Sequence, residues 1–465
     1  MENTDKTRIA LADDLTENRQ LRLERMFAQA AGEEDISRRD ECIKHFDLGG
    51  NRHQAIVYPE PVHFRHSASE PWQEIDNTLE AAIDRHGRSV LRNRANDVCI
   101  EFPQQTDSDN VASITENGRT FAWRFETPVQ TVSAAVRSGA ELRQAELLQR
   151  AAELTTTQAG QIDVTALGLK TGASTADIAS ALESAFEHRM RPAQMNAESR
   201  YANIFPGVSL RYELQGRSLK EDILLEKREA LQYVIIRLPD TYDYEAIDSG
   251  ELRILDKVTG ELCFKMHVPV IYDAEGNTTY GNIRLTSCAD HVRLEYIIDD
   301  AFLDNAVYPI TIDPLITAGS SRTAIEDTYV KKGATEGRNG QDYLHIGNSA
   351  TNKHAALIRF NKIPSLRSSD TVISAQLRLQ QYQAASSRYF TAHEILKPWD
   401  DETAIWTDFF DSNDNKLHDA IAEDVIDCTH GDNTEHNIIK VDVTDLFRKW
   451  CRRDPNSPET DTNHG

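Results

Sequence analysis

The chain has 465 residues, of which 75 are acidic and 51 are basic, so its formal net charge is −24. With 39% apolar residues it has enough hydrophobic material for globular domains, which excludes disorder over its whole length. A surface this acidic repels phosphate backbones, so nucleic acid is disfavoured as a partner. No run of about 18 apolar residues occurs, and we therefore predict no membrane insertion.

Neither the N-terminus nor the cysteines identify the cellular compartment of the protein. No basic stretch followed by an apolar core opens the chain, so no secretory signal peptide is visible. The six cysteines are scattered without short spacings, which matches neither a zinc site nor a dense disulfide framework. Ordinary thiols, mostly buried, are the favoured interpretation.

The first part of the chain is predicted to be helical and the next part to be β. Residues 1–50 are expected to form an N-terminal helical segment, because apolar residues interleave with Arg and Glu over the first 35 or so positions. Residues 51–315 are expected to form a β-rich domain. Phe121, Trp123 and Phe125 alternate with polar neighbours, which is the period of a half-buried strand.

Two segments depart from this β pattern. At about 131–198 the composition predicts a helical insertion with helices over 140–154 and 175–190, and Ser174 with Asp177 forms a capping box for the second helix. The run at 308–314 contains two prolines, which favours an edge strand or a linker.

Residues 316–465 are predicted to form a separate C-terminal β-sandwich of the jelly-roll kind. Short alternating runs, such as Ala356, Ile358 and Phe360, are separated by breaks rich in Gly, Asn and Ser. Near the end, a strand precedes a short helix that begins at Thr444 and turns Trp450 inward. The fold class is therefore mainly β.

Several short motifs in a fixed order carry a resemblance in this last part. They are Asp327-Thr328-Tyr329-Val330, Leu344-His345-Ile346-Gly347, Leu357-Ile358-Arg359-Phe360, Val372-Ile373-Ser374-Ala375, Trp399 with Trp406, Val441-Asp442-Val443-Thr444 and Asn463-His464-Gly465. With these motifs the region resembles the DNRLRE domain, a disaggregatase-related β-sandwich grouped with carbohydrate-binding modules. The resemblance implies a domain that binds polysaccharide or serves as a structural spacer.

The upstream part resembles the region that precedes this domain in bacterial wall-associated and Rhs or YD-repeat surface proteins. The matching segments are 58–63, 72–79, 203–208, 220–223 and 308–314. Two departures matter: no YD repeats follow, and the chain stops at Gly465 where the family continues into a final strand. We therefore expect a fragment of a longer protein, or a gap that another segment fills.

The sequence lacks the short motifs of serine hydrolases, zinc metalloproteases and nucleotide-binding proteins. There is no G-x-S-x-G, no H-E-x-x-H and no phosphate-binding glycine loop. Asp400, Asp401 and Glu402 beside Trp399 match the carboxylates of a glycosidase, but a solvated turn is the favoured interpretation. We therefore predict a protein that is not an enzyme and has no cofactor other than a structural calcium ion.

The residue types that such a binding protein needs are an exposed aromatic platform for a sugar and oxygen ligands for a metal. Candidate ligand-binding residues are Tyr382, Tyr389 and Trp399. Candidate Ca²⁺ ligands are Asp327 and Asp442, although ordinary hydrogen bonding in turns or at strand ends is the favoured interpretation for both.

The favoured hypothesis is a non-catalytic bacterial surface or secreted protein that binds polysaccharide or cell-wall glycan, or acts as a spacer, through its C-terminal β-sandwich. The alternative is the N-terminal part of a Rhs-like polymorphic toxin or of a polysaccharide-degrading enzyme. The extracellular or cell-surface location follows from the resemblance alone, and a cytoplasmic location stays open because no signal peptide is visible.

Overall fold

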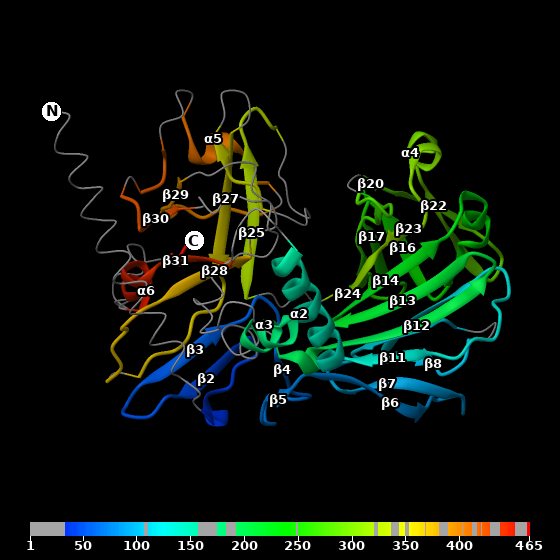
Figure 1. Cartoon of the computed structure of the whole chain (residues 1–465), viewed down its shortest axis with the longest axis horizontal. Coiled ribbons are helices and arrows are strands. Elements are labelled where there is room, and N and C mark those ends of the chain that lie inside the picture. Colours follow the sequence, from blue (N-terminus) through cyan, green and yellow to red (C-terminus); the bar gives the residue numbers. More distant parts are fainter. Residues whose placement is uncertain are drawn as a thin grey trace.

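A computed structural model provides the coordinates, and the chain is described only in part. The described residues are 33–106, 110–156, 174–182, 192–247, 250–319, 324–335, 344–348, 353–367, 369–380, 389–401, 403–411, 416–419, 421–427, 438–451 and 463–465. Their secondary structure is mainly antiparallel β, so the predicted fold class is confirmed. Figure 1 shows a large β unit beside a smaller C-terminal unit.

The large unit contains an eight-stranded antiparallel sheet. Its strands follow the order β21 (Asn282–Ser287), β22 (His291–Ile297), β15 (Ile235–Pro239), β10 (Arg119–Phe125), β9 (Ala112–Glu116), β8 (Val98–Pro103), β7 (Ser89–Ala95) and β6 (Asp76–Ile83). In β10 the residues Phe121, Trp123 and Phe125 are buried and alternate with half-buried ones. The predicted alternation is therefore confirmed in this strand.

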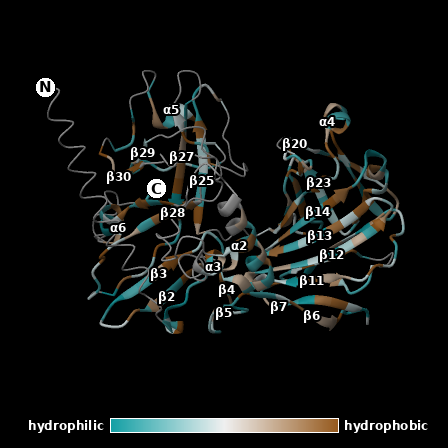
Figure 2. Cartoon of the chain, viewed as in Figure 1, coloured by the Kyte–Doolittle hydropathy of each residue, from teal (hydrophilic) through white to brown (hydrophobic). Residues whose placement is uncertain are grey.

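An eleven-stranded sheet packs on it. Its main path is β11 (Ala135–Ser138), β12 (Asn196–Phe205), β13 (Val208–Gln215), β14 (Ser218–Leu225), β24 (Leu315–Ala318), β18 (Leu262–Met266), β17 (Leu252–Asp256) and β16 (Tyr242–Ala246), with β19 (Val270–Tyr272), β20 (Thr278–Tyr280) and β23 (Ile310–Asp313) beside it. Figure 2 shows hydrophobic and hydrophilic residues alternating along these strands.

Aromatic side chains join the two sheets into one core. Phe102 stacks on Tyr212 with ring centroids 5.0 Å apart, and Phe121 stacks on Phe264 at 5.8 Å. Since each pair joins one sheet to the other, the large unit is a two-layer sandwich with a single hydrophobic core.

The helical insertion lies between two paired strands. Helices α2 (Gly139–Thr156) and α3 (Thr175–Leu182) follow β11 and precede β12, which pair with each other. The Ser174 hydroxyl donates to Asp177 at 2.6 Å, and the Asp177 amide donates back to the Ser174 oxygen at 3.2 Å, so the predicted capping box is confirmed. The predicted end of the second helix, 183–190, lies outside the described residues.

The structure corrects the prediction for residues 308–314. Strand β23 pairs with β14 on one side and with β19 on the other, so it is neither an edge strand nor a linker. Pro309 and Pro314 flank this strand instead of interrupting its ladder. The following strand, β24, pairs with β14 and β18, so the large unit extends to at least residue 318 and past the predicted boundary at 315.

The segment before the large unit is also different from the prediction in its described part. Residues 1–32 lie outside the described residues, but β1 (Glu33–Glu34) and β2 (Ile43–Asp47) lie within the segment expected to be helical, and they form a three-stranded sheet with β3 (His53–Val57). Lys362 donates to Glu41 at 2.7 Å, and the Ala324 amide donates to the Pro59 carbonyl at 2.9 Å. The segments that flank this sheet therefore contact the C-terminal unit, and Figure 1 shows β2 and β3 next to it.

The C-terminal unit has three small antiparallel sheets in its described part. They are β25 (Ile325–Lys331) with β27 (Lys353–Phe360) and β26 (Gly347–Asn348), β28 (Gln376–Gln380) with β31 (Ile438–Asp442), and β29 (Tyr389–Ala392) with β30 (Asp424–Asp427). Helix α6 (Thr444–Cys451) buries Trp450, as predicted, and it also buries Leu446.

The remaining described elements are short. They are β4 (His63–Phe64), β5 (Gln73–Glu74), α4 (Asp300–Asn305), α5 (Trp406–Phe409) and the 3-10 turns Ile36–Arg38, Ala193–Met195 and Arg228–Tyr233. Among the described helices, none has both the length and the apolar character that a membrane span needs. Five described cysteines are free thiols, and Cys428 lies outside the described residues.

Candidate functional site

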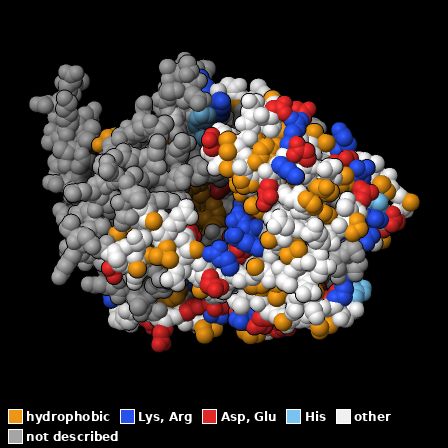
Figure 3. Space-filling model, turned by 45° about the vertical axis from the view of Figure 1, so that its right-hand side comes forward, with side chains coloured by type: hydrophobic (Ala, Val, Ile, Leu, Met, Phe, Trp, Pro, Cys, Tyr) orange, Lys and Arg blue, Asp and Glu red, His pale blue; other side chains and the backbone are white. Residues whose placement is uncertain are grey.

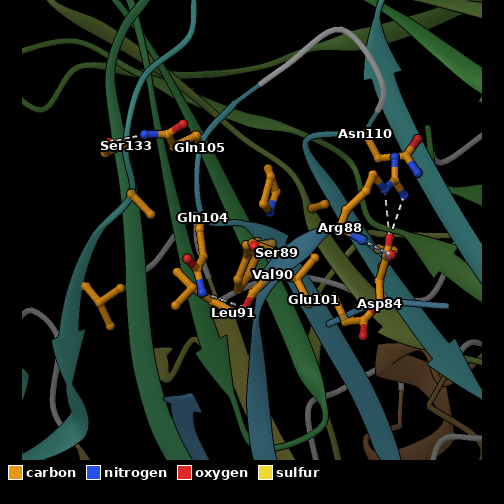
Figure 4. Close-up of a pocket in the computed structure, with 16 residues that line it drawn as sticks. Asp84, Arg88, Ser89, Val90, Leu91, Glu101, Gln104, Gln105, Asn110 and Ser133 are labelled. Atoms are coloured by element: carbon orange, nitrogen blue, oxygen red, sulfur yellow. Dashed lines mark hydrogen bonds and ion pairs between the residues drawn. The ribbon is translucent and has the colours of Figure 1, made fainter. Parts of the chain in front are cut away.

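The strongest candidate site is a polar pocket on the eight-stranded sheet, with a volume of about 580 Å³. Strands β7, β8 and β9 form its floor, and the segment at 133–136 forms one wall (Figure 4). Its lining is Asp84, Arg88, Ser89, Val90, Leu91, Glu101, Phe102, Pro103, Gln104, Gln105, Asn110, Ala112, Ser113, Ser133, Ala134 and Val136. We call this the polar pocket.

The alternation of β8 explains how polar groups reach this pocket. Val98, Ile100 and Phe102 are buried in the core, so Glu101 points to the opposite face. Glu101 is the direct cross-strand partner of Ser113 on β9, which places a carboxylate and a hydroxyl side by side.

One end of the polar pocket is charged and fixed. Arg88 donates from Nε to Asp84 Oδ2 at 2.8 Å, and the backbone amides of Arg88 and His86 donate to Asp84 Oδ1, both at 2.8 Å. Desolvation opposes ionisation, but these hydrogen bonds outweigh it and lower the pKa of Asp84 to about 2. Asp84 is therefore an acceptor that stays ionised, and it is a poor general acid.

Carboxamides form the other end. Gln104 donates to the Val90 carbonyl at 3.3 Å, and Gln105 donates to the Ser133 hydroxyl at 3.3 Å. A carboxamide offers two N–H donors and an oxygen with two lone pairs, so each of these bonds uses only part of the group. The described lining contains no His, Cys, Lys or Tyr. The arrangement suits hydrogen bonding to a polar ligand better than nucleophilic or acid–base chemistry.

The predicted aromatic ligand residues lie in the C-terminal unit, away from this pocket's lining. Tyr382 lies outside the described residues. Tyr389 is 66% exposed on β29, as a stacking platform requires. Trp399 is buried, donates from Nε1 to the His464 carbonyl at 2.6 Å, and lies under the Arg359 guanidinium, whose carbon is 5.0 Å from the ring centroid. These contacts give Trp399 a place in the core of this unit.

The two predicted calcium ligands lie on different sheets. Asp327 is on β25, where burial and the neighbouring Asp401 raise its pKa. Asp442 ends β31, and its Oδ1 accepts hydrogen bonds from the Thr444 amide at 2.9 Å and the Thr444 hydroxyl at 2.6 Å. The role seen for Asp442 is therefore to position the start of α6.

Three side chains of types that can bind a metal lie together elsewhere, and the sequence did not point to them. They are Glu34, His63 and Glu74, whose possible ligand atoms lie within 4.8 Å of one another. Lys44 pairs with Glu74, and Arg39 donates to both oxygens of Glu34 at 2.6 and 3.0 Å. Because two cations already balance two carboxylates, a metal ion would have to displace Lys44. This group fits a buried ion-pair network better than a metal centre.

Glu221 is a carboxyl group that is fully buried in the core of the large unit. Its Oε1 accepts hydrogen bonds from Trp123 Nε1 at 3.0 Å and from the Tyr212 hydroxyl at 2.6 Å. Burial outweighs these bonds and raises its pKa to about 6. A raised pKa is typical of a general acid, but Glu221 is fully buried between the sheets and does not line the polar pocket. Its role is therefore structural.

Asp400, one of the acidic residues that follow Trp399, stabilises a turn. Asp400 Oδ1 accepts from the Thr403 amide at 3.1 Å and from the Thr403 hydroxyl at 2.9 Å, which is a turn interaction. Glu402 lies outside the described residues. The turn interpretation favoured from the sequence agrees with these bonds.

Comparisons with known proteins add little. No family model and no curated protein matches the sequence. A solved structure of a heparinase III with methylated lysines matches at 10% identity and a TM-score of 0.25, over 63% of this chain and 43% of that one. The chain thus spans less than half of that protein, and at this TM-score the similarity carries no argument about fold or activity.

Proposed function

We propose that this chain is a non-catalytic glycan-binding protein of the bacterial surface or exterior, and that its polar pocket holds a neutral polysaccharide. The observation that carries the proposal is the lining of that pocket, where hydroxyls, carboxamides and carboxylates share one open cavity of about 580 Å³. Most small-molecule pockets of this size are largely apolar. A polar lining is the complement of a ligand covered with hydroxyl groups.

The chemistry of the pocket supports binding over cleavage. Glycoside hydrolysis needs a carboxylic acid that is protonated near neutral pH, and the pKa of Asp84 is lowered to about 2. The oxygens of Asp84 already accept hydrogen bonds from Arg88 and two backbone amides, so Asp84 fixes the Arg88 side chain at this end of the pocket. The exposed Tyr389 of the C-terminal unit supplies a second contact for a long polysaccharide, which would raise the overall affinity by avidity.

The test is a screen of the full chain against neutral cell-wall and plant polysaccharides by affinity electrophoresis, followed by titration of the best ligand. Gln105→Ala combined with Asn110→Ala should weaken binding about tenfold, because two hydrogen bonds to the ligand are lost. Gln73→Ala, at an exposed glutamine on β5, is the matched control and should leave affinity unchanged.

Two results would contradict the proposal. Binding that is the same in the double variant and the wild type would place the ligand elsewhere. Binding to none of the polysaccharides would favour the spacer interpretation of the whole chain.

A further inference from the structure

The face of the eleven-stranded sheet that points away from the core carries a row of cations. It consists of Arg137 on β11, Arg200 on β12, Arg211 on β13 and Lys220 on β14, and we call it the cation face. The alternation of these strands puts it there, because Tyr201, Tyr212 and Glu221, the neighbours of three of these residues in sequence, are all buried in the core.

The charges on this face are arranged in two layers. The carboxylates that pair with the cations lie deep, with the side chains of Glu198 and Asp222 each 1% exposed. The cations above them reach solvent, with Arg200 46% and Arg211 30% exposed. Glu213 on β13 also points away from the core and is the cross-strand partner of Lys220, so a ligand on this face meets the two guanidinium groups beside one half-buried carboxylate.

The two central guanidinium groups are held in place from below. Arg200 donates from Nε and Nη2 to the two oxygens of Glu198 at 2.6 and 2.8 Å. Arg211 donates from Nε to Oδ2 of Asp222, and its Nη2 lies beside the same oxygen. Lys220 lies 2.8 Å from Asp313. Fixed in this way, the side chains lose little further entropy when they bind a ligand.

Arg200 and Arg211 are direct cross-strand partners. Like charges in that position are normally destabilising. Each buried carboxylate offsets one guanidinium, and each guanidinium has five N–H donors, of which the carboxylate uses two. The remaining donors of both side chains are available to an anion that bridges them.

We infer that the cation face binds an acidic polysaccharide through the carboxylates of its uronic acid residues. The adjacent Arg200 and Arg211 side chains favour an anion. Figure 3 shows Lys and Arg side chains beside a hollow near the middle of the molecule, with Asp and Glu side chains next to them. A uronic acid polymer carries one charge per sugar, so a small number of cations can bind it even on an acidic protein. Duplex DNA, with a charge every ~1.7 Å, would be repelled by the rest of the surface.

This inference extends the proposed function to a second surface, and the two fail separately. The polar pocket lies on the eight-stranded sheet and its ligand is neutral, whereas the cation face lies on the eleven-stranded sheet. Variants of one surface are expected to leave the other unchanged.

The test is calorimetric titration of the full chain with polygalacturonate oligosaccharides. Two double variants, Glu198→Gln with Arg200→Gln and Arg211→Gln with Asp222→Asn, remove a cation together with its buried partner. The net charge is unchanged and no buried charge is left unpaired. Each should weaken binding at least about tenfold. The control, Glu80→Gln with Arg94→Gln, removes an exposed pair on β6 and β7 and should bind like the wild type.

A measurement on the wild-type chain keeps the inference testable if a variant fails to fold. Its affinity for polygalacturonate should fall at least about tenfold between about 50 mM and about 500 mM NaCl, because salt screens exposed charges. Absence of binding at the lower salt concentration, equal binding by folded double variants, or tighter binding of duplex DNA than of polygalacturonate would each overturn the inference.

Discussion

Replacing Trp399 with alanine is expected to lower the free energy of unfolding of the C-terminal unit by about 4 kcal/mol. The side chain is 8% exposed and packs in a small core with Val330, Leu357 and Trp406. Truncation also removes the hydrogen bond from Nε1 to the His464 carbonyl. Hydrogen exchange of the β27 amides, measured by mass spectrometry, reports this loss of stability, because Leu357 of the same core lies on β27.

The matched control is Tyr389→Ala in the same unit. Because Tyr389 is 66% exposed, its removal should change stability by less than about 0.5 kcal/mol. If it instead stacks on a sugar, its loss weakens glycan binding. Unchanged exchange in the Trp399 variant together with lost glycan binding would contradict the core assignment and restore Trp399 as a ligand residue.

Glu221→Gln is expected to change how stability depends on pH. The native pKa of about 6 lies above the ordinary value of 4.5, so the native state keeps a proton that the unfolded state releases between these values. Stability therefore falls as pH rises from about 4.5 to about 6, by about 2 kcal/mol in total. Glutamine does not titrate, and its oxygen accepts the same hydrogen bonds from Trp123 and Tyr212.

Urea unfolding at several pH values measures this effect. Between pH about 4 and pH about 7.5, the free energy of unfolding of Glu221→Gln should rise by about 2 kcal/mol relative to that of the wild type. Glu245→Gln, at an exposed position on β16, is the control for general charge and should show no such gain. If the free energies of unfolding of wild type and Glu221→Gln changed equally with pH, the result would contradict the desolvation of Glu221 that the structure indicates.

Features that depend on neighbours in sequence could be predicted well. The Ser174–Asp177 capping box depends on residues three apart, and the burial of Phe121, Trp123 and Phe125 depends on the two-residue period of a strand. For residues 308–314 the sequence predicts an edge strand or a linker, because Pro309 and Pro314 cannot donate to a ladder. Both prolines lie just outside β23, so they leave its hydrogen bonds to β14 and β19 intact.

The polar pocket could not be predicted, because distant segments form it. Glu101 and Ser113 become neighbours only through the register of β8 with β9, and Gln105 meets Ser133 across 28 residues of sequence. The cation face depends in the same way on the register that sets Arg200 opposite Arg211. One signal in the sequence points to it: Arg211 lies between Leu210 and Tyr212, which predicts a strand with a charged outer face.

The central claim is that this chain binds glycans and does not cut them. The most direct measurement incubates the full chain with neutral polysaccharides and with polygalacturonate, and follows both gel retardation and the release of new reducing ends. The account predicts retardation on at least one polysaccharide with no new reducing ends. Release of reducing ends by the pure chain, or free migration through every polysaccharide, would contradict it.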